Sequence, residues 1–304
     1  MQVLVTGASG LLGSALAAAL REQGHGVRRL GRGGDVEHVW DPRRGILAAS
    51  VWDGIEAVAH LAGESVAGFW TPSKKRAIHD SRVLGTKLLC ESLAASPQRP
   101  RLLLSASAVG FYGDRADAPL TEEDEGGTGF LAETCLEWEG ATVAAETAGM
   151  RVVRLRFGVV LARGGGMLKP IVPLFRCGLG GRLGDGRQFM SWIALEDAVA
   201  AMLHALATTS LRGAVNVVAL EPVTNAEFTR TLARVLHRPA LLPAPAFALR
   251  FLLGAMADDM LLASARVLPR RLLDTGFRHR HPVLEEALRA VLQPSRARAG
   301  GSTA

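Results

Sequence analysis

Residues 6–13 read Thr6-Gly7-Ala8-Ser9-Gly10-Leu11-Leu12-Gly13, between a β-branched run and a helical pattern. In such a strand–turn–helix unit Gly7 permits the tight turn, Gly10 lets the backbone approach a pyrophosphate, and Gly13 lets the helix pack closely on the sheet. The first turn of the helix offers free N–H groups and a positive potential to the phosphates. The stretch therefore predicts a dinucleotide-binding site formed by the first strand and helix.

Strand-like and helix-like segments alternate beyond this loop. The expected strands are Gln2–Thr6, Gly26–Leu30, Ala57–Leu61, Leu102–Ser107, Arg151–Leu155 and Ala214–Val218. The expected helices are Leu11–Arg21, Pro72–Ala95, Leu131–Thr147, Leu195–Ala207 and Asn225–Leu236. This alternation predicts an α/β fold with a doubly wound parallel sheet (a Rossmann fold) and helices on both faces.

The pattern changes after about Val159, where glycine runs indicate long loops, and from Pro239 onward prolines separate short helical segments. A chain of 304 residues is long enough for about two domains. The predicted division is a Rossmann domain at 1–160 rejoined by 190–220, a smaller, mainly helical substrate or cap region at 161–189 and 221–293, and a disordered tail at 294–304.

Composition excludes several classes of protein. With 48% hydrophobic and 21% charged residues the chain is not intrinsically disordered. The net charge of +6 is spread over the whole length, so we expect an Arg-rich solvated surface and no nucleic-acid partner. The cysteines Cys90, Cys135 and Cys177 form no C-x-x-C pair, and His279 and His281 have no third ligand nearby. Neither a disulfide framework nor a metal site is predicted.

No membrane partner is predicted either. Glycines interrupt the N-terminal apolar run, which therefore does not read as a signal peptide. The apolar stretch Phe247–Ala263 carries Arg250, Asp258 and Asp259 and cannot span a bilayer. We expect a soluble cytoplasmic protein, a monomer or homodimer, that acts on a small molecule.

Arg32 follows the second expected strand, which reads Arg28-Arg29-Leu30-Gly31-Arg32. A site that prefers NAD places an acidic residue about 20 residues beyond the glycines, where it accepts hydrogen bonds from the ribose. A guanidinium in that place pairs instead with a 2′-phosphate. The sequence predicts NADP(H) as the cofactor, the alternative being a surface arginine in an Arg-rich chain.

Several motifs resemble the extended short-chain dehydrogenase/reductase superfamily, namely T-G-x-x-G-x-x-G at 6–13, His60-Leu61-Ala62-Gly63-Glu64 and Ser105-Ala106-Ser107. Its atypical epimerase-like branch is more similar still. The shared features are Ser81-Arg82-Val83-Leu84-Gly85-Thr86, Trp138-Glu139, Gly158-Val159-Val160-Leu161, Phe175–Gly181, Phe189–Ile193, Thr224-Asn225-Ala226-Glu227-Phe228 and Thr275-Gly276-Phe277. The resemblance covers residue 1 to about residue 292.

The resemblance implies that the segment Leu61–Glu64 and Arg82 lie near the cofactor together with the glycine loop. The full set of predicted cofactor-binding residues is Thr6, Gly7, Ser9, Gly10, Leu11, Leu12, Gly13, Arg32, Leu61, Ala62, Gly63, Glu64, Arg82, Ser105 and Val160.

The superfamily's Tyr-x-x-x-Lys motif, in which the lysine lowers the pKa of the tyrosine that moves a proton, is absent. Cys135 and Glu139 take the two places one helical turn apart. They are either a proton relay or a structural pair. Ser107 matches the superfamily's active-site serine, and Tyr112 is expected in the pocket wall. The predicted catalytic set is therefore Ser107, Tyr112, Cys135 and Glu139.

The loop that binds the substrate diphosphate in sugar-nucleotide epimerases also differs. Met190 and Ser191 stand where the family has Arg and Asp, unless Arg187 reaches in from three positions earlier. We therefore predict an NADP(H)-binding, epimerase-like oxidoreductase acting on an unidentified small substrate. The alternative is a non-catalytic, NADP(H)-responsive binding or regulatory protein.

Overall fold

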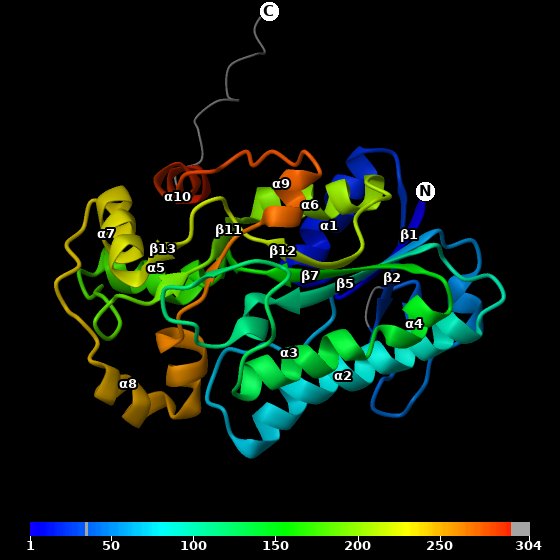
Figure 1. The fold of residues 1–304 in the computed structure, drawn as a ribbon, viewed down its shortest axis with the longest axis horizontal. Coiled ribbons are helices and arrows are strands. Elements are labelled where there is room, and N and C mark those ends of the chain that lie inside the picture. The colour runs from blue at the N-terminus through cyan, green and yellow to red at the C-terminus, as the bar shows by residue number, and fades with distance from the viewer. Residues whose placement is uncertain (34–35, 293–304) are drawn as a thin grey trace, which may run out of the picture.

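The computed structural model describes residues 1–33 and 36–292, so the predicted tail at 294–304 lies outside the described residues. A parallel sheet runs through the centre in the order β12-β7-β5-β4-β1-β2-β3 (Figure 1). Its strands are β1 (Gln2–Thr6), β2 (Gly26–Gly31), β3 (His38–Val39), β4 (Ala57–His60), β5 (Leu102–Ala108), β7 (Arg151–Phe157) and β12 (Gly213–Val217). The predicted doubly wound α/β fold is confirmed, and the strand order reverses beside β1, where such sheets bind ligands.

Helices cover both faces of this sheet. Helices α1 (Leu11–Glu22) and α6 (Leu195–Ala207) pack on one face, and α2 (Pro72–Ala95), α3 (Phe130–Gly140) and α4 (Val143–Thr147) cover the other (Figure 1). Side chains alternate along β1, so Val5 packs with Leu20 of α1 while Leu4 packs with Leu93 of α2. Two apolar cores, one on each face, hold the sheet in place.

Shorter elements complete the chain beyond the sheet. They are η1 (Ala49–Trp52), η2 (Val109–Tyr112), β6 (Pro119–Leu120), β8 (Val159–Ala162), β9 (Gly165–Gly166), α5 (Leu168–Arg176), β10 (Phe189–Met190), β11 (Trp192–Ala194), β13 (Val223–Thr224), α7 (Asn225–Leu236), α8 (Ala246–Leu253), η3 (Ala257–Leu262), β14 (Arg266–Val267), α9 (Arg270–Asp274) and α10 (Leu284–Leu292). Helices α5, α7 and α10 enclose a third apolar core.

The single helix expected over Leu131–Thr147 is wrong, because the chain forms α3 and α4 with a break between them. At the break the Thr142 hydroxyl donates to the Glu139 carbonyl over 2.7 Å, and Arg154 Nε donates to the same hydroxyl over 2.8 Å. Such side-chain bonds compete with the helix's own backbone bonds. The break follows Gly140, the residue with the lowest helix propensity in the segment.

The later part of the chain returns to the first core. Strand β12 and helix α6 lie within the 190–220 stretch, and Leu272 and Phe277, from the 221–293 stretch, are buried in the core that α1 and α6 share. Among the residues that the structure describes, no helix combines the length and the apolar character needed to cross a membrane.

A buried chain of hydrogen bonds joins the ends of β1 and β4 to helices α2 and α3. Thr6 Oγ1 accepts N–H groups from Leu61 and Ala62, each over 3.1 Å, so its own hydrogen points to His60 Nδ1 at 2.8 Å. The neutral imidazole then carries its hydrogen on Nε2 and donates to Thr86 Oγ1 over 3.0 Å. Burial lowers the pKa of His60 to about 4, consistent with this neutral tautomer.

The folded protein is expected to lose stability as the pH falls from about 6.5 toward 4. Over that range the unfolded chain binds a proton at His60 while the folded chain does not, so the proton stabilises the unfolded state. The loss between pH 7 and pH 5 amounts to about 2 kcal/mol from this residue alone. Urea unfolding of the wild-type protein and of His60→Gln at pH 7 and pH 5 measures this loss of stability. All other groups titrate equally in the two proteins, so the difference between them reports on His60. Equal pH dependence in the two proteins would contradict the assignment.

Candidate functional site

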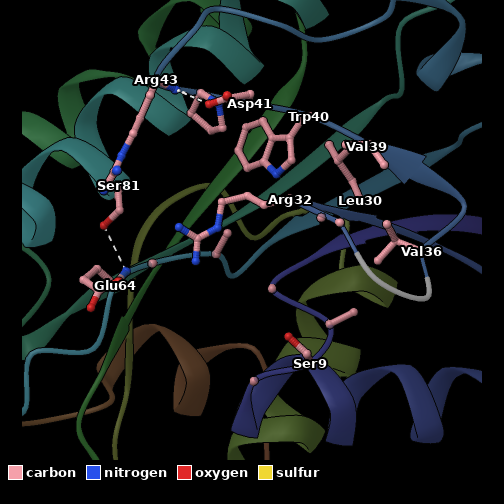
Figure 2. Close-up of a pocket in the computed structure, with 18 of the residues that line it drawn as sticks. Ser9, Leu30, Arg32, Val36, Val39, Trp40, Asp41, Arg43, Glu64 and Ser81 are labelled. Atoms are coloured by element: carbon pink, nitrogen blue, oxygen red, sulfur yellow. Dashed lines mark hydrogen bonds between the residues drawn. The ribbon is translucent and has the colours of Figure 1, made fainter.

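A cavity of about 1200 Å³ lies at the carboxyl ends of β1, β2 and β4. The glycine loop forms its floor, and the end of β2, the stretch from Val36 to Ile46, the segment Leu61–Glu64 and one side of α2 form its walls. Figure 2 shows side chains from these separate segments surrounding one space. The cavity is therefore at the point where the strand order reverses, and the glycine loop singled out in the sequence lines it.

The glycine loop passes so close to its neighbours that side chains do not fit at two positions. Gly7 has φ +65°, and a Cβ atom there would lie 2.7 Å from the Leu61 carbonyl oxygen. A Cβ atom on Gly13 would lie 2.2 Å from the Gly7 carbonyl oxygen. Gly10 differs, because its nearest neighbour would be 3.2 Å away and the residue faces the cavity. The loop is thus a backbone cradle at a helix N-terminus, which suits a pyrophosphate.

Of the residues described, four arginines and three carboxylates line the cavity. Two of the carboxylates already have partners on α2. Glu64 pairs with Lys74 over 2.7 Å, and Asp80 pairs with His79 over 3.0 Å. The hydrogen bond from Lys74 lowers the pKa of Glu64. Arg32 forms no ion pair within residues 1–33 and 36–292 and extends into the cavity (Figure 2). An unpaired guanidinium beside the phosphate cradle fits a further phosphate group.

Arg82 holds the wall that carries Gly63. Its Nη1 donates to the carbonyls of Glu64, over 2.9 Å, and Ile78, over 3.0 Å. Its guanidinium lies 5.2 Å from the centre of the Trp138 ring. A Cβ atom on Gly63 would lie 3.4 Å from this guanidinium, so the two residues are in contact range. Arg82 thus supports the segment that lines the cavity.

The structure separates the predicted cofactor residues into two groups. Those that line the cavity are Gly7, Ser9, Gly10, Arg32, Leu61, Ala62, Gly63 and Glu64. Those that lie behind or beside it are Thr6, Leu11, Leu12, Gly13, Arg82, Ser105 and Val160. Thr6 is fully buried and all its bonding capacity is used, so its side chain positions the loop and does not face the cavity.

A second polar cluster lies where β5, α3 and β7 meet. Ser107 Oγ donates to Glu139 Oε1 over 2.7 Å. Arg156 donates to both carboxylate oxygens of Glu139, through Nε over 2.8 Å and through Nη2 over 2.9 Å. Only 5% of the Arg156 side chain and 11% of the Glu139 side chain are exposed, so the pair is nearly dry. This arrangement can hold a carboxylate in a fixed orientation behind a hydroxyl group.

Cys135 does not join this cluster. Its thiol lies among apolar side chains, including Phe111, Leu120 and Val218. Burial raises the pKa of Cys135 to about 12, so the thiol is protonated at neutral pH. The location agrees with the structural alternative for Cys135, while Glu139 meets Ser107 and Arg156.

Tyr112 differs from its expected place in the pocket wall, because its side chain is fully buried. Its hydroxyl accepts Arg156 Nη1 over 2.9 Å and lies within hydrogen-bond distance of the Thr121 carbonyl and of Asn216 Oδ1. Burial raises the pKa of Tyr112, so the phenol stays protonated. The residue bonds to Arg156 and does not line the cavity described above.

Sequence reasoning missed Arg156, Trp40 and Arg43. The available signal for Arg156 was weak, because it is one of three arginines that interrupt the apolar strand Arg151–Phe157. A charge in a central parallel strand needs a buried partner, but nothing in the spacing identifies Glu139 as that partner. Trp40 and Arg43 lie in a stretch that carries no periodic pattern.

In the loop at residues 184–191, the two positions that hold Arg and Asp in sugar-nucleotide epimerases carry side chains with other contacts. Met190 is partly buried in the third core, and Ser191 is buried with its hydroxyl bonded to the Ala265 carbonyl over 2.7 Å. Arg187 lies exposed on the turn formed by the glycines. In the described part of the chain, no group of three or more His, Cys, Asp or Glu residues is placed to hold a metal ion.

Sequence profiles of two families match the chain. The NAD-dependent epimerase/dehydratase family matches residues 3–218, and a domain of unknown function (DUF1731) matches residues 244–291. An epimerase family protein of Mycobacterium bovis is 44% identical over 290 residues, which are 94% of this chain and 96% of that protein.

Two solved structures are similar over nearly the whole chain. The human epimerase family protein SDR39U1, crystallised with NADPH, superposes with a TM-score of 0.88 at 32% identity, over 97% of this chain and 100% of that chain. A nucleoside-diphosphate sugar epimerase from Corynebacterium glutamicum superposes with a TM-score of 0.80 at 39% identity, over 96% of this chain and 58% of that chain.

Gly10→Val is expected to abolish dinucleotide binding and leave the fold nearly intact. The added side chain enters the cradle, and its Cβ atom would lie 3.2 Å from the Gly7 carbonyl oxygen, a tight contact but much less severe than the one at Gly13. Gly13→Ala is the matched contrast, because its Cβ atom meets backbone and must lower stability as well. Calorimetric titration with NADPH and thermal melting separate the two effects. Wild-type affinity in Gly10→Val would show that the loop is only a turn.

Proposed function

The chain belongs to the NAD-dependent epimerase/dehydratase family, and on that premise we propose that it binds NADPH and acts as an oxidoreductase or epimerase on a small substrate. The observation that carries the proposal is the cavity in which a side-chain-free backbone cradle and an unpaired guanidinium, Arg32, face the same space. The NADPH in the crystal structure of the human relative supports the choice of cofactor.

Different residues of the cavity bind different parts of the cofactor. Backbone N–H groups of the first turn of α1, from Leu11 onward, bind the pyrophosphate, and Arg32 pairs with the 2′-phosphate. Ala62 and Gly63 offer a surface without bulky side chains to the rest of the dinucleotide. Such a cofactor supplies hydride transfer, and the protein must supply the proton transfer.

Ser107 and Glu139 are the groups we assign to that proton. When a substrate alcohol is oxidised, its hydroxyl proton passes to Ser107 Oγ as Ser107 passes its own proton to Glu139 Oε1, and reduction runs the same path in reverse. The 2.7 Å bond between the two side chains fits this relay. Arg156 acts as a positioning residue, because its two bonds fix both oxygens of the Glu139 carboxylate.

The substrate is proposed to be small and to carry little charge. The positions that bind a diphosphate in sugar-nucleotide epimerases are Met190, packed in an apolar core, and Ser191, bonded to the backbone. The Glu139–Arg156 pair beside Ser107 adds no net charge. A neutral carbonyl or hydroxyl compound suits these surroundings better than a nucleotide sugar.

A non-catalytic, NADPH-responsive role is the second candidate, and the burial of Ser107 favours it, since only 3% of that residue is exposed. The two roles differ in one measurement. An enzyme oxidises bound NADPH when offered small aldehydes and ketones in turn, whereas a binding protein holds NADPH tightly and never consumes it. Absorbance of the reduced nicotinamide follows the reaction directly.

NADPH is expected to bind about ten-fold to a hundred-fold more tightly than NADH, and Arg32→Ala is expected to remove most of that preference. A hydrogen bond between charged groups contributes about 1.5–3 kcal/mol, which corresponds to this range of affinity. Calorimetric titration of both proteins with both nucleotides checks it. Equal affinity of the wild-type protein for NADPH and NADH would refute the assignment of Arg32.

Ser107→Ala is expected to lower turnover by about 10²–10⁴ with NADPH affinity unchanged, because it removes the relay and leaves the Glu139–Arg156 pair intact. Glu139→Gln should lower turnover as much but also cost about 3–5 kcal/mol of stability, since Arg156 stays buried without its carboxylate. Cys135→Ser, in the apolar cluster, should retain activity. Full activity in Ser107→Ala would rule out the relay.

A further inference from the structure

We propose that Arg43 is the second guanidinium that binds the 2′-phosphate of NADPH, approaching it from a different segment of the cavity wall than Arg32. The inference rests on the proposed NADPH binding and adds to it a residue far from the glycine loop and outside the predicted site. Figure 2 shows Arg32 extending from the end of β2 and the Arg43 side chain running from the turn that follows β3 toward Ser81 of α2, and both residues line the cavity.

Trp40 fixes these two segments relative to each other. Its backbone N–H donates to the Gly31 carbonyl over 2.9 Å, and Gly31 directly precedes Arg32. Its ring is 3% exposed and packs edge-on against His60, with centres 5.9 Å apart. The ring also lies against Gly85 of α2. Trp40 therefore holds the segment that carries Arg43 against Gly31, the residue next to Arg32, and against the buried side of the cavity wall at His60 and Gly85.

The turn beyond Trp40 is itself well ordered by hydrogen bonds. The backbones of Asp41 and Ile46 exchange two bonds, of 2.9 and 3.0 Å. The Asp41 carboxylate accepts the N–H of Arg43 over 3.0 Å. A short closed turn of this kind holds the backbone of Arg43 in place, so only its side chain has to be ordered when a ligand binds.

Arginines outnumber carboxylates in this part of the cavity, where Asp41 also lies and where Arg32 helps to lower the pKa of Glu64. Arg43 and its neighbour Arg44 form no ion pair within residues 1–33 and 36–292, and neither does Arg32. Three like charges that line one cavity repel one another, and the repulsion is relieved when a dianion lies between them. A 2′-phosphate carries that charge and accepts several N–H groups at once.

Two arginines on one phosphate are expected to act together. Arg43→Gln should weaken NADPH binding about five-fold to ten-fold, because one of two exposed charged hydrogen-bond donors to the phosphate is lost. NADH binding should not change. The double variant should show no preference between the two nucleotides, and added salt should reduce the wild-type preference more than that of Arg43→Gln.

The test is calorimetric titration of the full chain with NADPH, NADH, 2′,5′-ADP and ADP. 2′,5′-ADP and ADP differ in the 2′-phosphate and contain no nicotinamide. Comparing their affinities therefore measures recognition of the 2′-phosphate without any contribution from turnover. Arg76→Gln is the control, because Arg76 is an exposed cation on α2 that does not line the cavity. Circular dichroism and thermal melting verify that each variant folds.

Loss of preference for the 2′-phosphate in Arg43→Gln, with Arg76→Gln like the wild type, supports the proposal. Three results overturn it: an unchanged preference in Arg43→Gln, an equal loss in Arg76→Gln, or a loss in Arg44→Gln with none in Arg43→Gln. In these cases the NADPH assignment stands if Arg32→Ala still loses the preference. Absence of binding by any nucleotide to the wild-type chain refutes both the inference and the proposed function.

Discussion

The hydroxyl group of Thr6 is the contact on which the cavity depends. It accepts the N–H groups of Leu61 and Ala62 and donates to His60, so the end of β1 and the end of β4 are joined through one side chain. The glycine loop begins at the next residue, and a Cβ atom on Gly7 would lie within 2.7 Å of the Leu61 carbonyl. The floor and one wall of the cavity therefore cannot move independently. Pre-organisation of this kind lowers the entropy lost when a dinucleotide binds.

The Glu139–Arg156 ion pair explains how this fold can lack Tyr-x-x-x-Lys without leaving an unpaired charge in its interior. A carboxylate at position 139 needs a buried cation, and β7 supplies one with two bonds, of 2.8 and 2.9 Å. Removing either partner alone is costly, so the two residues are constrained as a unit. The phenol of Tyr112 is used to hold Arg156. The remaining hydroxyl group beside the carboxylate is that of Ser107, which is why the proton path is assigned there.

Local signals made much of the fold predictable. The glycine loop, six of the seven strands of the central sheet and Arg32 each depend on neighbouring residues, and the structure places them close to their predicted positions, whereas the short strand β3 was not predicted. What could not be predicted is long-range pairing. Arg156 meets Glu139 only because β7 lies beside β5 and under α3, and Arg43 meets the cavity only because Trp40 is bonded to Gly31. The break at Thr142 likewise depends on a partner from β7.

Buried polar side chains also bind the irregular C-terminal segment to the site. Ser191 accepts the Val267 N–H over 2.9 Å, and the Glu122 carboxylate accepts the N–H of Asn216 over 3.0 Å and that of Arg271 over 3.2 Å. Backbone groups of an irregular segment need such partners when they are buried. The Asn216 side chain donates to the Leu268 carbonyl of this segment. Its Oδ1 atom lies 2.8 Å from the Tyr112 hydroxyl, which accepts a hydrogen bond from Arg156. The segment that matches a domain of unknown function is therefore joined to the polar cluster by a continuous series of hydrogen bonds.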